Sequence, residues 1–461
     1  MPRRLDPLWT LGDLAQAAGG RLMGASGSTA VTGISIDTRT LQPGDAFFAI
    51  SGVSRDAHEF VPDAIDAGAS AAVISRGEAE RSVVVDDVLA ALGHVGVAAR
   101  ARLLKGTPVV AVTGSVGKTG TKEMLELALA TGGPVHASAA SYNNHWGVPL
   151  SLARMPADVD AAVFEIGMNH AGEITPLTAM VRPTIAIVTT VAAVHLAFFP
   201  SVAAIADAKA EIFTGLEDGG VAIVPSDNEH TDRLIEAAQR ARAEVVTFGE
   251  GGDVSLVALD EAGAVEADVF GERVAYTLLE AAPHVANNTL AVLAALSVAG
   301  WDITEGARAL GNWTAPRGRG RRVRLRPAGG EAILFDDCFN ANPKSTGAAI
   351  ARLGRTEARR RVVILGDMRE LGRTAGELHR GLAPLLVDAD VRIVHTVGTM
   401  TEELRDALPF DLRGEHVATA DELLTRLPEV EPGDAILVKG SKAVGLAAVV
   451  DALERRYGLH A

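Results

Sequence analysis

The sequence contains a single cysteine, Cys338, among its 461 residues. One cysteine excludes an intramolecular disulfide framework and favours a reducing compartment. Long hydrophobic runs are also missing, because no stretch reaches the roughly 18–20 apolar residues that a membrane helix needs. The N-terminal stretch has basic side chains but lacks the apolar segment of a secretory signal. We therefore expect a cytoplasmic protein with no integral membrane segment.

An excess of positive charge is absent as well. The chain has 43 basic and 58 acidic residues and a net charge of −15, and this balance disfavours non-specific nucleic-acid binding. Apolar residues make up 48% and charged residues 22% of the chain, which is typical of a soluble globular protein. At roughly 100–200 residues per domain, the length indicates about three domains.

Strand-like and helix-like segments alternate along most of the chain, which predicts an α/β fold. Residues 1–106 indicate a small mixed α/β N-terminal domain. Residues 107–314 are expected to form a central domain with a doubly wound, mostly parallel sheet, in which residues 243–280 look irregular and β-rich. A Gly-, Pro- and Arg-rich linker begins near Pro316. Beyond it the alternation resumes, so residues 315–461 are predicted to form a C-terminal Rossmann-like α/β domain.

The segment 112-VTGSVGKTGTKEM-124 lies between a predicted strand, TPVVAVTG, and a predicted helix. Val112 occupies the position of the first glycine in the standard Gly-x-x-x-x-Gly-Lys-[Ser/Thr] pattern, so only a compact loop, Gly114–Thr119, remains. In this context the loop N–H groups and the helix N-terminus would hold phosphate oxygens. Lys118 would reach the β- and γ-phosphates, and Thr119 would ligate Mg²⁺. The alternative is an ordinary turn between a strand and a helix.

Polar residues near the ends of other central strands add to this candidate site. Glu165 ends one predicted strand, and His195 follows another closely. Ligands of a parallel sheet bind at the carboxyl ends of its strands. Glu165, His195 and Thr119 could therefore converge, and their side chains suit Mg²⁺ or Mn²⁺ beside a nucleotide. Taken alone, a single histidine is more often a structural residue.

Two further features of the central domain are weaker signals. Asn143 and Asn144 are adjacent in a polar loop, where they could bind phosphate or amide groups or hold a turn. Lys209 has helical spacing near acidic residues, and composition alone favours a solvated helix face.

In the C-terminal domain, three buried strands are each followed by polar residues, at 336–343, 366–371 and 439–442. Polar runs at strand ends are either loops or sites, and three in one sheet indicate a binding edge. Cys338 has no general base paired with it in the sequence, so we interpret it as a packing residue.

Together these segments resemble the Mur ligase family of peptidoglycan synthesis. The family's ATP loop has the compact form T-G-x-x-G-K-[ST], which is present at Thr113–Thr119, and the similarity covers essentially the whole chain. The resemblance implies an ATP-dependent amide ligase that activates a carboxylate as an acyl phosphate, with ATP and two Mg²⁺ ions as cofactors. DDCFNANP and LGDMRELG are similar to segments of members that join UDP-N-acetylmuramoyl-tripeptide to D-alanyl-D-alanine. We expect a monomer.

The resemblance also implies roles for individual residues. The residues implied to bind ATP are Gly114, Ser115, Val116, Gly117, Lys118, Thr119, Gly120 and Asn288, with Arg319 or Arg322 and Asp336 or Asp337. The residues implied to be catalytic are Lys118, Glu165, His195 and Lys209. The implied Mg²⁺ ligands are Thr119, Glu165, His195 and Lys209, the last as a carbamate. The residues implied to bind substrate are Asp37, Thr38, Arg39 and His58 at the UDP end, and Asn143, Asn144, Asn340 and Asn342.

Two departures from the family pattern weaken parts of this assignment. Val285 replaces an asparagine in the segment expected to approach adenine, and Lys442 replaces an arginine, so it cannot form a bidentate fork. Three alternatives stay open at this point. They are another amide ligase of the superfamily (the preceding Mur ligase or a folylpolyglutamate-type enzyme), a P-loop phosphotransferase or NTPase, and a non-catalytic nucleotide-dependent binding protein.

Overall fold

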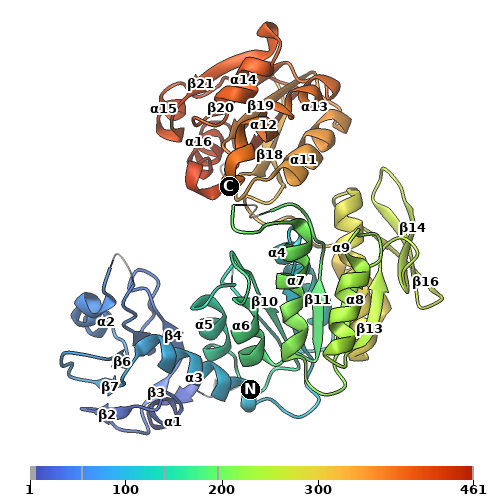
Figure 1. Ribbon diagram of the computed structural model, residues 1–461. Coiled ribbons are helices and arrows are strands. Elements are labelled where there is room, and N and C mark those ends of the chain that lie inside the picture. The colour runs from blue at the N-terminus through green and yellow to red at the C-terminus, as the bar shows by residue number, and fades with distance from the viewer. Residues whose placement is uncertain (1–6, 53–54, 140, 195–196, 459–461) are drawn as a thin grey trace. The chain divides into compact units, whose positions relative to one another are not determined.

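The computed structural model describes residues 7–52, 55–139, 141–194 and 197–458. The chain divides into two compact units (Figure 1). The first unit consists of Met1–Thr190 and Ala206–Gly311, and the second of Val191–Ile205 and Asn312–Ala461.

The N-terminal part of the first unit is built around short strands. These are β1 (Trp9–Thr10), β2 (Arg21–Met23), β3 (Ala30–Val31), β4 (Gly33–Ser35), β5 (Asp45–Phe48), β6 (Ala71–Ile74) and β7 (Ser82–Val84). Five of those described form a sheet in the order β2-β7-β6-β5-β4, in which β4 to β7 run parallel. The helices of this part are α1 (Leu11–Ala17), η1 (Ala57–Phe60), α2 (Val61–Asp66) and α3 (Val88–Ala101).

A larger sheet forms the centre of the first unit. Its strands are β8 (Val109–Thr113), β9 (Val135–Ala137), β10 (Ala161–Glu165), β11 (Ile185–Val188), β12 (Val221–Pro225), β13 (Glu244–Phe248), β14 (Val254–Leu259), β15 (Ala264–Val269) and β16 (Glu272–Thr277). The described strands lie in the order β16-β15-β14-β13-β12-β11-β8-β10-β9. β8, β10, β11 and β12 are buried along their whole length, as expected for parallel strands that helices cover on both faces.

Two groups of helices cover this central sheet. The helices that follow β8 along the chain are α4 (Lys118–Leu129), α5 (Gly147–Ala153), α6 (Ile174–Val181), α7 (Val202–Ala210), η2 (Glu211–Gly215), α8 (Thr231–Arg240), α9 (Pro283–Ala299) and α10 (Ile303–Leu310). α4, α9 and α10 contact one another, and α5 and α6 form a second group with α3. This layered arrangement confirms the predicted doubly wound sheet.

Helix α5 of the central part belongs to the hydrophobic core of the N-terminal sheet. α3 packs along α5, and Leu150 and Ala153 of α5 belong to the same buried cluster as residues of the N-terminal sheet. The indole N–H of Trp9 donates to the carbonyl of Ala153 at 3.0 Å, and the guanidinium of Arg102 lies 3.6 Å from the Trp9 ring centroid. The two parts are therefore joined by packing as well as by the chain.

The second unit has its own sheet with helices around it. Its strands are β17 (Arg321–Leu325), β18 (Ala332–Asp337), β19 (Arg360–Gly366), β20 (Ile393–Val397), β21 (Arg413–Val417) and β22 (Asp434–Lys439), in the order β17-β18-β22-β19-β20-β21. All described pairings are parallel except that of β17 with β18. The helices are α11 (Pro343–Arg355), η3 (Gly372–Thr374), α12 (Ala375–Arg380), α13 (Ala383–Asp388), α14 (Glu402–Ala407), η4 (Phe410–Leu412), α15 (Ala420–Thr425), η5 (Lys442–Val444) and α16 (Ala447–Tyr457).

The predicted α/β class is confirmed. Residues 243–280 are β-rich as expected: β14, β15 and β16 form an antiparallel meander that extends the central sheet, with a register shift between Leu256 and Ala258. Burial alternates along β15 and β16, because one face packs inward and the other is solvated. Among the helices in the described part of the chain, none is long and apolar enough to cross a membrane.

Candidate nucleotide and metal site

The compact glycine loop lies between the end of β8 and the start of α4. Gly114 has φ +151° and Gly117 has φ +87°, and Lys118 begins the helix. A Cβ atom on Gly114 would lie 1.9 Å from the Thr189 hydroxyl oxygen. Gly114 is therefore required for space as well as for its backbone conformation. The loop runs directly into the N-terminus of α4. Main-chain N–H groups at such a position bind phosphate.

The strand beside β8 fixes the conformation of this loop. The Thr189 hydroxyl, just after β11, donates to the Val116 carbonyl at 2.6 Å, and the Ser115 N–H donates to the Thr190 carbonyl at 2.8 Å. Because β8 and β11 run parallel with Val188 opposite Thr113, their carboxyl ends lie together. The phosphate loop and the end of β11 therefore lie at the same edge of the sheet.

Glu165 ends β10, on the other side of β8, and its side chain is fully buried. Its carboxylate accepts a hydrogen bond from the Thr119 hydroxyl at 2.6 Å and another from the Asn143 amide at 2.7 Å. A hydroxyl and a carboxylate this close supply the hard oxygen donors that Mg²⁺ prefers. Thr119 and Glu165 therefore fit a magnesium ion next to the phosphate loop.

Lys118 and Lys209 lie close enough for their charges to interact, but they differ in environment. The Lys118 ammonium donates to the Gly114 carbonyl at 2.7 Å, within its own loop. Lys209 is 2% exposed, so the expectation of a solvated helix face is wrong. Burial, together with the like charge of Lys118, lowers the pKa of the Lys209 amine well below its usual range. Lys209 is buried because most other positions of α7 are apolar, so that the helix packs into the interior.

Other predicted residues of the first unit have definite places. The Asn288 carboxamide lies against Gly117, where a Cβ atom would approach it to 3.0 Å, whereas Val285 is buried in the core. Asn144 accepts from the Gly147 N–H at 2.9 Å and supports the start of α5. His195 lies outside the described residues. Within those that are described, no group of three or more His, Cys, Asp and Glu side chains is placed to hold a metal.

The second unit carries another group of predicted residues at the carboxyl ends of β18 and β22. Lys439 is only 1% exposed. Its ammonium pairs with the Asp337 carboxylate at 2.8 Å and donates to the Asn340 carbonyl at 2.9 Å. Burial raises the pKa of Asp337, and Lys439 opposes that shift. Arg319 lies 3.9 Å from the ring centroid of Phe339.

Two polar residues of this group have structural contacts of their own. Asn342 is the N-cap of α11, because its side chain accepts from the Ser345 N–H at 2.9 Å. The Asn340 side chain accepts a hydrogen bond from the Ala341 N–H, and Asn340 is exposed. The Cys338 thiol is buried and donates to Asp336 at 3.0 Å, and burial raises the pKa of this thiol. The packing role predicted for Cys338 is confirmed.

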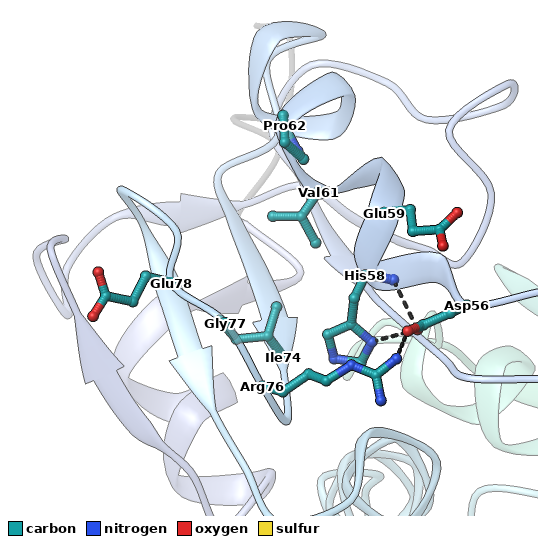
Figure 2. A pocket seen from close by; sticks show the side chains of 9 residues that line it. All are labelled: Asp56, His58, Glu59, Val61, Pro62, Ile74, Arg76, Gly77 and Glu78. Atoms are coloured by element: carbon teal, nitrogen blue, oxygen red, sulfur yellow. Dashed lines mark hydrogen bonds and ion pairs between the residues drawn. The ribbon is translucent and has the colours of Figure 1, made fainter.

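The N-terminal sheet carries the residues predicted for the UDP end, and one of them, His58, lines a pocket of about 350 Å³ (Figure 2). His58 lines this pocket with Asp56 and Arg76, which form an ion pair. The His58 Nε2 atom accepts from the Ser75 N–H at 3.0 Å, so Nδ1 carries the proton and donates to Asp56 at 2.7 Å. Burial lowers the pKa of His58, which agrees with this neutral form.

The other residues predicted for the UDP end follow β4. Arg39 bonds Asp37 through two nitrogen atoms, at 2.9 and 2.5 Å, and the hydrogen bond lowers the pKa of Asp37. Thr38, between them in the sequence, is half-buried. These residues lie at the same carboxyl edge of the parallel strands as His58.

Comparison with known proteins identifies the family. The family model described as the Mur ligase middle domain matches residues 112–296, the Mur ligase glutamate ligase domain matches 320–442, and the Mur ligase family catalytic domain matches 30–106. A UDP-N-acetylmuramoyl-tripeptide–D-alanyl-D-alanine ligase of Synechocystis is 34% identical, over 92% of this chain and 92% of the relative. The chain belongs to the Mur ligase family.

Solved structures of other Mur ligases agree with the fold. MurF from Acinetobacter baumannii superimposes with a TM-score of 0.84 at 29% identity, covering 97% of this chain and 99% of that one. MurF ligase from Thermotoga maritima, solved in complex with ADP, gives a TM-score of 0.72 at 25% identity, covering 92% and 98%.

Two buried lysines of this Mur ligase were missed by the sequence interpretation. Lys122 lies one turn after Lys118 on α4 and is 3% exposed, and Lys439 lies at the end of β22. The signal for Lys122 was its spacing, since residues four apart share a helix face. Lys439 could have been recognised as a charged residue at the end of a buried strand, because the segment 439–442 was already a candidate part of the binding edge.

Proposed function

We propose that this Mur ligase joins D-alanyl-D-alanine to UDP-N-acetylmuramoyl-tripeptide, with ATP as the energy source, in the cytoplasmic stage of peptidoglycan synthesis. The observation that carries the proposal is end-to-end similarity to ligases named for this reaction, at 31–34% identity over 91–96% of this chain. The compact phosphate loop and the hydrogen-bonded Thr119–Glu165 pair support the proposal, because such groups suit the binding of ATP and Mg²⁺.

The reaction consists of two transfers. The terminal carboxylate of the tripeptide attacks the γ-phosphorus of ATP, and the bond to the bridging oxygen breaks to release ADP. The amine of D-alanyl-D-alanine then attacks the acyl phosphate and loses a proton, and inorganic phosphate leaves as the amide forms. The first transfer brings two anions together, whose repulsion at ~4 Å is roughly 1 kcal/mol in water and several-fold more in a drier site.

The residues around the loop are suited to reduce this repulsion. Lys118 would turn from the Gly114 carbonyl to the phosphates, and the N–H groups of the loop would hold phosphate oxygens. Magnesium, when bound, would neutralise phosphate charge, with Thr119, Glu165 and His195 as protein ligands. A carbamate on Lys209 would serve a second ion, and the low amine pKa supports this assignment because only the neutral amine reacts with CO₂.

The remaining assignments complete the proposal. The UDP end would bind at Asp37–Arg39 and His58, and Asn288, Arg319 and Asp337 would contact ATP. Asn143, Asn144, Asn340 and Asn342 would serve the substrates. Three domains, 1–106, 107–314 and 315–461, would divide these tasks in a monomer.

An amine-dependent ADP-release assay tests the proposal. Purified protein would receive ATP, Mg²⁺, UDP-N-acetylmuramoyl-tripeptide and one amine from a panel. D-Alanyl-D-alanine should stimulate ADP release, and D-alanine, meso-diaminopimelate and L-glutamate should not. Stimulation by a single amino acid alone, or equal ADP release without any amine, would overturn the proposal. Sedimentation velocity under the same conditions tests the monomer.

A further inference from the structure

Lys122 is a buried cation that the proposed chemistry does not use. It lies on α4, three residues after Thr119 and one helical turn after Lys118, and the residue is 3% exposed. Removing an ammonium group from water is costly, so a methionine of similar length would fill this space with less desolvation. The contacts of the amine therefore indicate what the charge is retained for.

The Lys122 ammonium donates to the main-chain carbonyl of Ser138 at 2.9 Å, and the Glu123 carboxylate lies 3.8 Å from it. Ser138 directly follows β9 and is 1% exposed. Its N–H donates to the Val163 carbonyl at 3.0 Å, and its hydroxyl accepts from the Glu165 N–H at 3.4 Å. Ser138 thus connects Lys122 to the last residues of β10.

These contacts join α4 to Glu165 by two routes. Thr119 and Lys122 face the same side of α4, as residues three apart on a helix do. Thr119 bonds the Glu165 carboxylate, while Lys122 holds Ser138, which contacts the Glu165 main chain. Helix α4 therefore holds both the side chain and the main chain of Glu165.

We propose that Lys122 is a positioning residue for Mg²⁺-nucleotide binding, which holds Glu165 at the correct distance from Thr119 by anchoring Ser138. This inference rests on the Mg²⁺-ATP part of the proposed function. Groups that orient metal ligands typically change metal affinity or activity 10–100-fold when they are removed. The alternative is that Lys122 only secures β9, which would affect stability without affecting the metal.

The test compares Lys122→Met and Lys122→Arg with the wild type in the full-length protein. The main readout is the Mg²⁺ concentration that gives half-maximal binding of a non-hydrolysable ATP analogue. We expect this concentration to rise about 10-fold in Lys122→Met and to return most of the way in Lys122→Arg, which keeps a charged donor. Lys105→Met, which removes an exposed lysine of the same unit, is the matched control and should stay within about two-fold.

A second readout needs neither metal nor nucleotide. Hydrogen exchange of peptides covering 161–167 should quicken in Lys122→Met, because the Glu165 N–H loses its anchored acceptor. If Lys122→Met does not fold, Lys122→Leu, which also removes the donor, is measured by the same criterion. A folded neutral variant with unchanged Mg²⁺ dependence and unchanged exchange would overturn the proposal. Failure of D-alanyl-D-alanine to stimulate ADP release would overturn the proposed function alone, because analogue binding does not require the amine.

Discussion

The hydroxyl of Thr119 and the carboxylate of Glu165 lie 2.6 Å apart, joining the first turn of α4 to the last residue of β10. Glu165→Gln keeps the shape but removes the negative charge. We expect kcat/KM to fall by about 100-fold, with the thermal unfolding midpoint changed little. Thr119→Ser, which keeps the hydroxyl, is the matched control and should retain most activity, whereas Thr119→Val should not. Near-normal activity of Glu165→Gln would rule out a metal-binding carboxylate here.

Lys209 is expected to carry a carbamate. Its amine is buried and its pKa is lowered well below the usual range, which favours the neutral form that reacts with CO₂ to give R–NH–COO⁻ and a proton. Protein in ¹³C-bicarbonate should show a carbamate carbon signal that disappears in Lys209→Met and persists in Lys344→Met, which alters an exposed lysine. Acid should remove the signal, because protonating the amine reverses the reaction. A spectrum of folded wild-type protein without this signal would contradict the assignment.

Gly114→Ala should disable the phosphate loop. The new methyl group would meet the Thr189 hydroxyl at 1.9 Å, and φ is +151° there. We expect loss of ATP-analogue binding by calorimetry and a lower thermal midpoint. Gly106→Ala separates backbone strain from crowding, since φ is +92° and nothing lies within 4 Å. It should cost only about 1 kcal/mol and leave nucleotide binding intact; equal effects of the two substitutions would show that crowding at Thr189 is unimportant.

His379 should make the second unit sensitive to acid. Its Nε2 accepts from the Met368 N–H at 2.9 Å and its Nδ1 donates to the Ala375 carbonyl at 2.6 Å, so the ring is held neutral. Burial lowers the folded-state pKa below that of the unfolded chain, near 6.5. The stabilisation is therefore complete above pH 6.5 and is lost as pH falls from there toward the folded pKa.

Urea unfolding at pH 7.5 and pH 5.5 measures this effect, with a fluorescence or circular-dichroism midpoint as the readout. His379→Gln should narrow the difference between the two midpoints. His94→Gln, a change at an exposed histidine, should leave the difference as it is in the wild type. An unchanged difference in His379→Gln would exclude this histidine as a source of acid sensitivity.

Cys338 should be unreactive in the folded protein. Its thiol is buried, bonded to Asp336 at 3.0 Å, and its pKa is raised. A thiol-specific disulfide reagent should label it slowly under native conditions and completely in denaturant, because the thiolate is the reactive form. Cys338→Ser should keep activity, since a hydroxyl can donate to Asp336. Rapid native labelling would contradict this prediction.

Residues whose roles depend on local geometry were the easiest to predict. The glycine loop is an example. Its positive φ values require glycine, and the preceding strand and the following helix have recognisable sequence patterns within the same short segment. Glu165 was also predictable, because strand ends of a parallel sheet meet at one edge. Lys209 was harder, since its burial depends on tertiary packing around α7. The largely apolar sequence VAAIADAKA was nevertheless a signal, because a helix that is apolar nearly all round is usually buried.

Contacts between side chains distant in sequence were the part that could not be predicted. Lys439 bonds Asp337 and Asn340 across two strands, and no local pattern predicts that pairing. The position of Asn342, in contrast, follows from its local sequence. Asn followed by Pro is a common helix start, and the structure places this residue at the cap of α11.

The core that α3 shares with α5 limits how the parts of this chain can be exchanged. A chimaera that took residues 1–106 from one relative and the remainder from another would place an unmatched α3 against α5. Trp9 would also meet a foreign partner at Ala153. Exchange is expected to succeed only when α5 is changed to match the incoming α3, so that the N-terminal part is inherited together with the helix on which it rests.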